Sequence, residues 1–349
     1  MKRRMLWLFL LPAVLMAFSG ATCREGLNGK DAIDAQKKGM ISGMGPGVIR
    51  EETTSTEGED FHVAMHPFED TLVFASTAYS KNSDLFYKKI GSRQRRQLTF
   101  HKGSDVWPTF NPEGDLLVFT SDRGGHWDLY MISFPPRPDE KPEKLAPSDT
   151  TKVHASWSQD GHSIVYSEYD EIAGDWRLKI LDLGGGDPET GEFAVSETLI
   201  REDNLYGIFP EWCPRQGDNR IVFQRARRRG GHLYGIWTIN ADGSGLTRVV
   251  DSTDYATINP SWHPTLDKIV YATVAVDEYE KSKGTRGVVR AEDIWVINVD
   301  GTGETRITDT ARIADWGPIF SRPFGRRIFF TSELANRINL WSKDYHPTR

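Results

Sequence analysis

The stretch Ser104–Ile132, SDVWPTFNPEGDLLVFTSDRGGHWDLYMI, decides the fold of this protein. It contains an apolar run, a Pro-Glu-Gly turn, a second apolar run, a polar Ser-Asp-Arg-Gly-Gly loop and a third run that opens on Asp-Leu-Tyr. The same order returns at Pro260–Tyr271 (PSWHPTLDKIVY) and at Pro318–Phe330 (PIFSRPFGRRIFF). A unit that recurs in this way is the sequence signature of a repeat architecture.

Six copies of the unit align on one apolar or aromatic residue, usually two residues before the turn proline. We call this residue the anchor position; it is occupied by Met65, Phe110, Trp157, Trp212, Trp262 and Phe320. Subtracting successive residue numbers gives spacings of 45, 47, 55, 50 and 58, close to the roughly 40–50 residues of a four-stranded propeller blade. Each copy holds short runs rich in Val, Phe, Leu and Tyr between Pro, Gly, Asn and Asp, which are strand and turn signals. The sequence therefore predicts an all-β, six-bladed propeller of four-stranded antiparallel blades over residues 45–349.

The sixth copy lacks a fourth strand at the C-terminal side, because only Asp344–Arg349 follow its third predicted strand. A spare β-like run lies at the other end of the repeats, at Val48–Thr54. An open sheet edge is an aggregation hazard. We therefore predict a velcro closure, in which the N-terminal run supplies the outer strand of blade six.

Two loops, Asn240–Gly245 and Asn298–Gly303, contain Asp-Gly and resemble metal-binding loops at first sight. Neither meets the pattern of an EF-hand loop. Asp-Gly is a strong signal for a tight strand reversal, because that turn requires positive φ. We interpret both loops as hairpin turns.

The N-terminus predicts an exported protein. Three basic residues, an apolar run Met5–Phe18 and small residues form the order of a signal peptide over residues 1–21, and residues 22–44 read as a flexible tether. The sequence fits both cleavage after Ala21 and lipidation of Cys23. Cleavage would place the protein in the periplasm, and lipidation would anchor it to the outer membrane through the lipid alone. The net charge of −6 argues against nucleic-acid binding.

The repeats resemble the WD-like β-propeller repeats of the TolB family. The resemblance rests on Pro108–Gly114, on Ser121–Gly125 with Asp128–Tyr130, on Trp157–Gly161, on Asp293–Trp295 with Asn298–Gly303, and on the pairs Leu98-Thr99 and Ile307-Thr308. It covers residues 60–345. TolB proteins of the Tol–Pal system carry an α/β domain before the propeller, and we expect no counterpart of it here. This argues against a Tol–Pal role. Docking of another envelope partner is still expected.

No catalytic motif stands out. The sequence has no G-x-S-x-G elbow, which a hydrolase of the prolyl-oligopeptidase type requires, and no H-E-x-x-H zinc motif. We expect no catalytic residues, no resident metal and no cofactor. Cys213 is expected to be a small residue at the core edge.

Two rings of residues are the candidate binding site, because equivalent positions of the blades meet around the propeller channel. The channel ring, three residues before each anchor position, contains His62, Trp107, His154, Phe209, Asn259 and Gly317. The strand-start ring, two residues earlier, contains Asp60, Asp105, Lys152, Gly207, Thr257 and Asp315. We expect both rings at the channel mouth, where they and Trp316 suit a peptide, loop or glycan. A solvated rim with aromatics packed between blades, and a cation site of histidines and aspartates, are the alternatives.

The sequence thus predicts a non-enzymatic, monomeric binding or scaffold module of the bacterial cell envelope. Its expected partner is an envelope protein or peptide that docks on the propeller face, with a peptidoglycan-associated lipoprotein as one candidate. The alternatives are a metal-dependent enzyme with polysaccharide lyase-type chemistry at the channel mouth and a component of a Tol-like complex.

Overall fold

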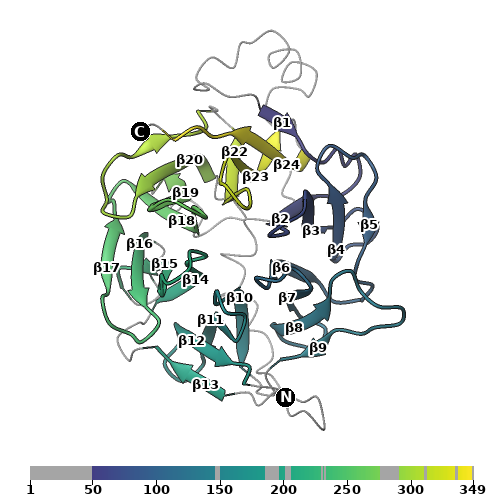
Figure 1. Ribbon diagram of the computed structural model, residues 1–349, viewed down its shortest axis with the longest axis horizontal. Helices are drawn as coiled ribbons and strands as arrows, with labels where there is room; N and C mark the ends of the chain where they lie inside the picture. Colours follow the sequence, from purple (N-terminus) through teal and green to yellow (C-terminus); the bar gives the residue numbers. More distant parts are fainter. Residues whose placement is uncertain are drawn as a thin grey trace, which may run out of the picture.

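The computed structural model describes residues 49–145, 150–184, 196–200, 206–228, 231, 233–275, 291–309, 313–334 and 337–347. The predicted signal peptide, the tether and Cys23 lie outside the described residues. Twenty-four strands form six four-stranded antiparallel sheets, which are arranged as the blades of a propeller around a central axis (Figure 1). Within the described residues, no helix has the length and hydropathy needed to span a membrane. The predicted fold class is confirmed.

The blades follow one another along the sequence, and in the first five the strands run from the channel outward in sequence order. Blade one contains β2 (Asp60–Met65), β3 (Thr71–Ser76), β4 (Asp84–Lys89) and β5 (Arg96–Gln97). Blade two contains β6 (Asp105–Phe110), β7 (Leu116–Ser121), β8 (Asp128–Ser133) and β9 (Glu143–Lys144). Blade three contains β10 (Thr151–Trp157), β11 (Ser163–Asp170), β12 (Asp175–Asp182) and β13 (Ser196–Leu199). Blade four contains β14 (Gly207–Trp212), β15 (Arg220–Ala226), β16 (Tyr234–Asn240) and β17 (Thr247–Val250). Blade five contains β18 (Tyr255–Trp262), β19 (Lys268–Ala275), β20 (Ala291–Asn298) and β21 (Thr305–Arg306).

Blade six combines the two ends of the propeller. It contains β22 (Ala314–Phe320), β23 (Arg327–Leu334), β24 (Arg337–Asp344) and, outermost, β1 (Ile49–Glu51). β1 runs antiparallel to β24 with Ile49 opposite Lys343, and the Arg50 guanidinium donates to both oxygens of the Asp344 carboxylate at 2.6 and 2.9 Å. The outer strand of the last blade therefore comes from the N-terminal side of the sequence.

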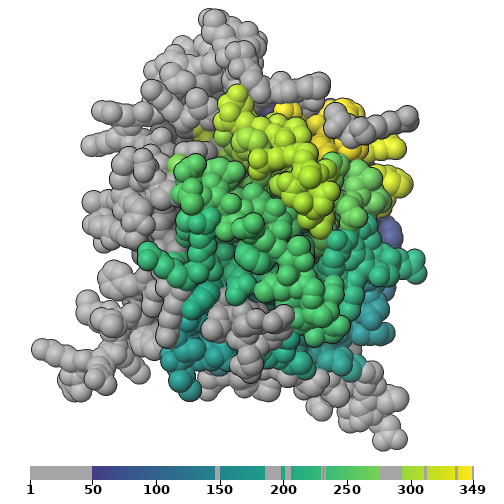
Figure 2. All heavy atoms as spheres, turned by 90° about the vertical axis from the view of Figure 1, so that its left-hand side faces the viewer, coloured from purple at the N-terminus to yellow at the C-terminus, as the bar shows by residue number. Residues whose placement is uncertain are grey.

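The hydrophobic core lies between the blades rather than inside any one of them. Six buried clusters each join the side chains of two neighbouring blades, so that all six interfaces of the ring are filled. Each cluster contains one anchor residue, which explains why this position recurs in the sequence. Trp262, for instance, is fully buried against Val222 and Ile236 of blade four. Truncating such an aromatic side chain costs about 3–5 kcal/mol. The side view shows blades four and five in green packed side by side, with blade six in yellow beyond them (Figure 2).

The two Asp-Gly loops are hairpin turns, as predicted. In the first, the Asp242 carboxylate accepts a hydrogen bond from the Ser244 backbone N–H at 2.8 Å, and Gly243 has φ of 84°. The second repeats this geometry at Asp300, Thr302 and Gly301. The carboxylates are therefore used to hold the turns.

Candidate functional site

Every inner strand carries the same backbone irregularity at the channel ring. In all six, the pairing register with the second strand shifts across the two residues that begin with the ring residue. Five non-glycine ring residues adopt left-handed φ values: His62 52°, Trp107 49°, His154 55°, Phe209 56° and Asn259 51°. Gly317 completes the ring with φ of 58°. Left-handed conformation costs an L-residue roughly 1–2 kcal/mol, so its sixfold repetition marks a constraint of the fold.

Four ring residues from consecutive blades pack against one another inside the channel. The ring centroids of His62 and Trp107 lie 4.6 Å apart and those of Trp107 and His154 lie 3.9 Å apart. The His154 ring in turn stacks on Phe209, with 3.5 Å between centroids. These side chains form an aromatic floor across the part of the channel next to blades one to four. The other two members of the channel ring, Asn259 and Gly317, add no aromatic ring to the floor.

The histidines of the aromatic floor are neutral. Burial lowers the pKa of His62 to about 3. Burial, and secondarily the nearby His62, hold the pKa of His154 well below its usual value. Near neutral pH the two side chains therefore act as aromatic packing groups and bring no positive charge into the channel.

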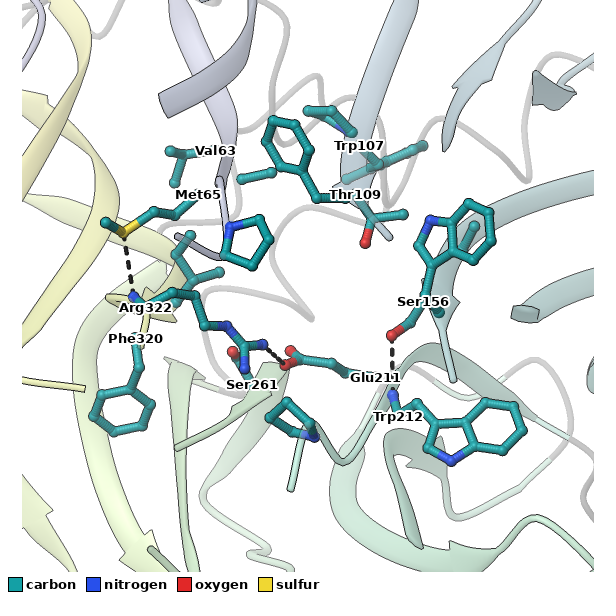
Figure 3. Close-up of a pocket in the computed structure, with 18 of the residues that line it drawn as sticks. Val63, Met65, Trp107, Thr109, Ser156, Glu211, Trp212, Ser261, Phe320 and Arg322 are labelled. Carbon is teal, nitrogen blue, oxygen red and sulfur yellow. Dashed lines mark hydrogen bonds and ion pairs between the residues drawn. The ribbon is translucent and has the colours of Figure 1, made fainter. Parts of the chain in front are cut away.

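A cavity of about 440 Å³ lies on this floor, with walls from all six inner strands. Its volume is within the range of small-ligand pockets. Around its opening lie the turn residues that follow each inner strand, including Pro67, Pro112 and Pro264. Phe68, which is 72% exposed, also lines it. Figure 3 shows Trp107, Thr109, Ser156, Ser261 and other labelled residues surrounding this space.

One ion pair spans the cavity. The Arg322 guanidinium, after the end of β22 in blade six, points toward the Glu211 carboxylate of β14 in blade four, with 3.6 Å between Nη2 and Oε1 (Figure 3). The side chains of Glu211 and Arg322 keep 21% and 26% of their surface exposed. Burial raises the pKa of Glu211 and lowers the pKa of Arg322. Except for this pair and the two neutral histidines, the described residues that line the cavity are uncharged.

Sequence reasoning missed this ion pair, although a signal was present. Glu211 stands one residue before its anchor position, where the other copies have Ala64, Thr109, Ser156, Ser261 and Ile319. Arg322 stands two residues after its anchor position, where four copies have the turn proline and one has Gln159. Both residues break the repeat with a charge. A search for such single-copy charges in aligned registers would have found them.

The strand-start ring does not share the cavity with the channel ring. Its members are absent from the cavity wall, and Asp60, Asp105, Lys152, Thr257 and Asp315 are almost completely buried. Residues two apart on a regular strand share a face, but the left-handed residue interrupts the alternation. The structure therefore does not bring the two rings together at one channel mouth: the channel ring lines the cavity, and the strand-start ring is buried outside it.

Charged members of the strand-start ring pair with side chains of their own blade or, at Lys152, of the preceding blade. Asp60 lies 3.1 Å from a guanidinium nitrogen of Arg95, and Asp105 accepts from Arg123 at 2.8 and 2.9 Å. The Lys152 ammonium lies 3.7 Å from the Asp128 carboxylate in blade two. Trp316 lines the cavity from the base of blade six and belongs to the core between blades five and six.

The donor groups near the channel do not fit a metal ion. His62 and His154 pack face and edge against aromatic rings, and Asp60 and Asp105 of the strand-start ring pair with arginines. Among the described residues, no group of three His, Cys, Asp or Glu side chains is arranged to hold a metal.

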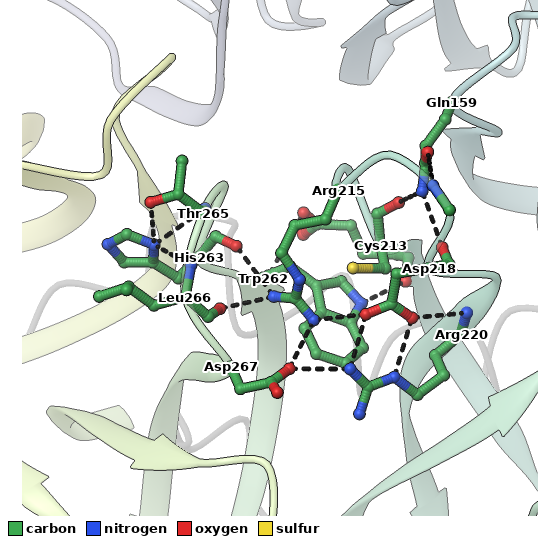
Figure 4. A network of polar contacts seen from close by, with 12 residues as sticks. Gln159, Cys213, Arg215, Asp218, Arg220, Trp262, His263, Thr265, Leu266 and Asp267 are labelled. Atoms are coloured by element: carbon green, nitrogen blue, oxygen red, sulfur yellow. Dashed lines mark hydrogen bonds and ion pairs between the residues drawn. The ribbon is translucent and has the colours of Figure 1, made fainter.

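Polar clasps between neighbouring blades surround the cavity opening. Arg215 of blade four donates to the Leu266 carbonyl of blade five at 2.5 Å and to Asp267 at 2.7 Å (Figure 4). Gln159 of blade three donates to two carbonyl oxygens of blade four, those of Cys213 and Asp218. These contacts tie the turns of adjacent blades together.

Two histidines make a second kind of clasp. The Nδ1 of His263 accepts from the backbone N–H groups of Thr265 and Leu266, so its Nε2 carries the proton, and this Nε2 faces Gly325 in blade six. The Nδ1 of His66 likewise accepts from two backbone N–H groups, and its Nε2 donates to the Gly114 carbonyl of blade two at 3.1 Å. Burial, and secondarily the charge of Arg215, lower the pKa of His263 to about 4.

Comparison with known proteins shows which propellers this one resembles. The family model of the TolB beta propeller domain matches residues 46–190. A TolB-type protein from Agrobacterium tumefaciens superposes with a TM-score of 0.58 at 16% identity, covering 87% of this chain and 92% of that one. The oligogalacturonate lyase of Vibrio parahaemolyticus gives 0.53 at 13% identity, over 85% and 93% of the two chains. An oligogalacturonate lyase in complex with manganese gives 0.54 at 15% identity, over 87% and 97%.

At such identities the structural likeness concerns the fold. No curated protein sequence gives a significant match to this one. The family match falls on blades one to three, and the remaining blades repeat their strand order and their channel-ring geometry. The protein is therefore a six-bladed β-propeller whose first three blades match the model of the TolB beta propeller domain.

Proposed function

We propose that the protein is a non-enzymatic binding module of the bacterial cell envelope, whose central cavity receives an extended segment of a partner protein. The observation that carries the proposal is the composition of the cavity: aromatic and proline side chains from six blades with one ion pair. Mostly apolar concave sites with a few placed polar groups are the usual form of a ligand site. The polar clasps tie the turns of adjacent blades together around the cavity opening.

The sequence supports the location and the class of partner. The signal-like residues 1–21 favour export, and the TolB-like propeller favours a protein as ligand. A peptidoglycan-associated lipoprotein is one candidate partner.

Photo-crosslinking in intact cells tests the proposal. A benzoylphenylalanine replaces Phe68, which is exposed at the cavity, or Phe100, which is 75% exposed and outside it. We expect a defined crosslink from position 68 to one segment of an exported protein, identified by mass spectrometry, and no such product from position 100. Equal labelling from both positions would overturn the proposal.

The alternative of a metal-dependent lyase is tested by titrating the full-length protein with manganese. A lyase site predicts about one bound ion per molecule and its loss in His154→Ala. Our proposal predicts no stoichiometric binding, because the rings of His62 and His154 are packed within the aromatic floor.

A further inference from the structure

We propose that Arg322 makes the central cavity selective for segments that present a carboxylate, with the neighbouring aromatic or apolar group resting on the aromatic floor. The inference rests on the proposed function and names the chemistry that the partner must carry. It is based on a difference between Glu211 and Arg322: the carboxylate has several hydrogen-bond donors, whereas the guanidinium has one distant carboxylate.

Arg322 is held in place through its backbone rather than through its charge. Its N–H donates to the Met65 sulfur of blade one at 3.2 Å, and the side chain then extends over the cavity to blade four. Its single ion pair, at 3.6 Å, is long compared with the roughly 2.7–2.9 Å of a charge-assisted hydrogen bond. Within the described residues, the guanidinium nitrogens of Arg322 make no hydrogen bond. A guanidinium carries five N–H donors, so Arg322 has capacity for a further acceptor.

Two other partly buried arginines of the propeller have guanidinium groups whose donors are well used. Arg123 donates to both oxygens of Asp105 within 2.9 Å. Arg215 makes four hydrogen bonds, among them one of 2.6 Å to Asp218. Arg322 is distinguished from both by its open donors and by its place on the cavity wall.

Glu211, in contrast, is already engaged. Its Oε1 accepts from the Trp262 backbone N–H at 3.3 Å, and the Ser261 side chain also bonds to the carboxylate. A cationic group of a ligand would have to compete with these donors and with Arg322. A ligand carboxylate meets open donors instead, and a carboxylate and a guanidinium fit each other in a bidentate manner.

The surroundings strengthen this preference. The floor beneath the pair brings no further charge, because His62 and His154 are neutral. Arg322 keeps 26% of its side chain exposed, so a ligand that covers it would take the guanidinium out of water. That is unfavourable without a close anion, and a carboxylate on the ligand would supply one. The carboxylate can come from an acidic side chain or from the C-terminus of a polypeptide.

The test compares matched probes by titration calorimetry on the full-length protein. The side-chain arm uses N-acetyl-Phe-Glu-amide against N-acetyl-Phe-Gln-amide, and the C-terminal arm uses N-acetyl-phenylalanine against its amide. We expect the acid to bind at least tenfold tighter than its neutral twin in at least one arm, and the arm with the larger ratio identifies the source of the carboxylate. Arg322→Gln should remove the ratio, and Arg322→Lys should retain only part of it, because lysine lacks the bidentate fork.

Arg248→Gln on the exposed face of β17 is the control and should leave the ratio unchanged. Thermal unfolding of each variant shows whether the fold persists. Equal binding of acid and neutral twin, an unchanged ratio in Arg322→Gln, or no binding of any probe overturns the inference. The proposed function is judged separately by the crosslink from position 68, so a positive crosslink with equal probe affinities would refute the carboxylate preference alone.

Discussion

The imidazole of His154 lies on the phenyl ring of Phe209, with 3.5 Å between centroids and 28° between the planes. The two residues come from blades three and four, and both adopt left-handed φ. The contact joins an inter-blade interface to the cavity floor. It also places a titratable group where its protonated form is strongly disfavoured, because a buried cation loses its hydration.

The first prediction concerns stability against pH. His62, His154 and His263 have folded pKa values below the roughly 6.5 of an unfolded polypeptide. At pH 5 the unfolded state therefore binds more protons than the folded state, and stability rises with pH. The stabilisation is complete above pH 6.5 and is lost as the pH falls toward about 4 for His263 and about 3 for His62. We expect urea unfolding to show a lower free energy at pH 5 than at pH 7.5, by up to about 1.4 kcal/mol per pH unit and histidine.

The matched variant for this prediction is His154→Phe. The ring geometry already accommodates Phe209 and Trp107 at left-handed φ, so the fold should persist while the pH slope becomes smaller. A slope identical to that of the parent protein would contradict the assignment of the pH dependence to this histidine.

The second prediction concerns the clasp between blades five and six. A Cβ at Gly325 would lie 2.2 Å from the His263 Nε2, and the imidazole cannot retreat because its Nδ1 is held by two backbone N–H groups. Gly325→Ala should therefore destabilise by about 1–3 kcal/mol more than Gly91→Ala. Gly91 has a similar positive φ and no atom within 4 Å of its Cβ, so it isolates the strain of the backbone. Equal losses in chemical denaturation would show that the clash is absorbed.

The third prediction concerns the Arg215 clasp. Arg215→Met keeps an apolar stem but removes three hydrogen bonds across the interface of blades four and five, to the carbonyls of His263 and Leu266 and to the Asp267 carboxylate. It also removes one to Asp218 within blade four. Bonds to charged groups contribute about 1.5–3 kcal/mol each, in part offset by water, so we expect a loss of about 2–4 kcal/mol in urea denaturation. Arg248→Met on exposed β17 serves as control. A loss no larger than in that control would mean that the clasp does not contribute to stability.

The fourth prediction uses Gly317 to close the cavity. Its φ of 58° matches the five non-glycine members of the channel ring, and a Cβ there meets no atom within 4 Å. Gly317→Phe should fold and should weaken binding of the acidic probe at least tenfold by filling the space beside Trp316. Gly91→Phe, which lies outside the cavity, should bind as the parent does. Unchanged affinity in Gly317→Phe would place the binding site elsewhere.

The fifth prediction concerns the thiol of Cys213, which is fully buried and whose pKa is raised to about 12 by burial. A thiolate is the reactive species. Peptide-level mass spectrometry should find Cys213 unmodified after iodoacetamide treatment of the native protein at pH 8 and modified after denaturation in urea. Rapid modification under native conditions would show that this core edge opens.

The propeller could be predicted from the sequence because the same packing contact between blades recurs in every blade and requires the same kind of residue each time. Trp157, Trp212 and Trp262 recur since each fills the interface with the preceding blade. The Asp-Gly turns were predictable for a local reason, since positive φ at Gly243 and Gly301 is a property of the turn itself.

The site was only partly predictable. The convergence of Trp107, His154 and Phe209 follows from aligned registers, but the separation of Asp105 from Trp107 does not. That separation depends on the left-handed backbone conformation of the channel-ring residue. The side chain at this position does not predict the conformation, because His, Trp, Phe and Asn all adopt it. The Glu211–Arg322 pair joins blades four and six, which are not neighbours. Such a contact depends on how far the two side chains extend across the channel, and sequence register does not give that distance.

The left-handed channel ring has a consequence for how this protein can be changed. The same backbone bend is adopted by five positions with four kinds of side group and by one glycine, so the conformation belongs to the position in the blade and not to the residue. The channel ring therefore offers six positions whose side chains can differ while the backbone conformation stays the same. Substitutions at these positions can therefore change what the cavity binds, in evolution or in the laboratory, without requiring a new backbone conformation.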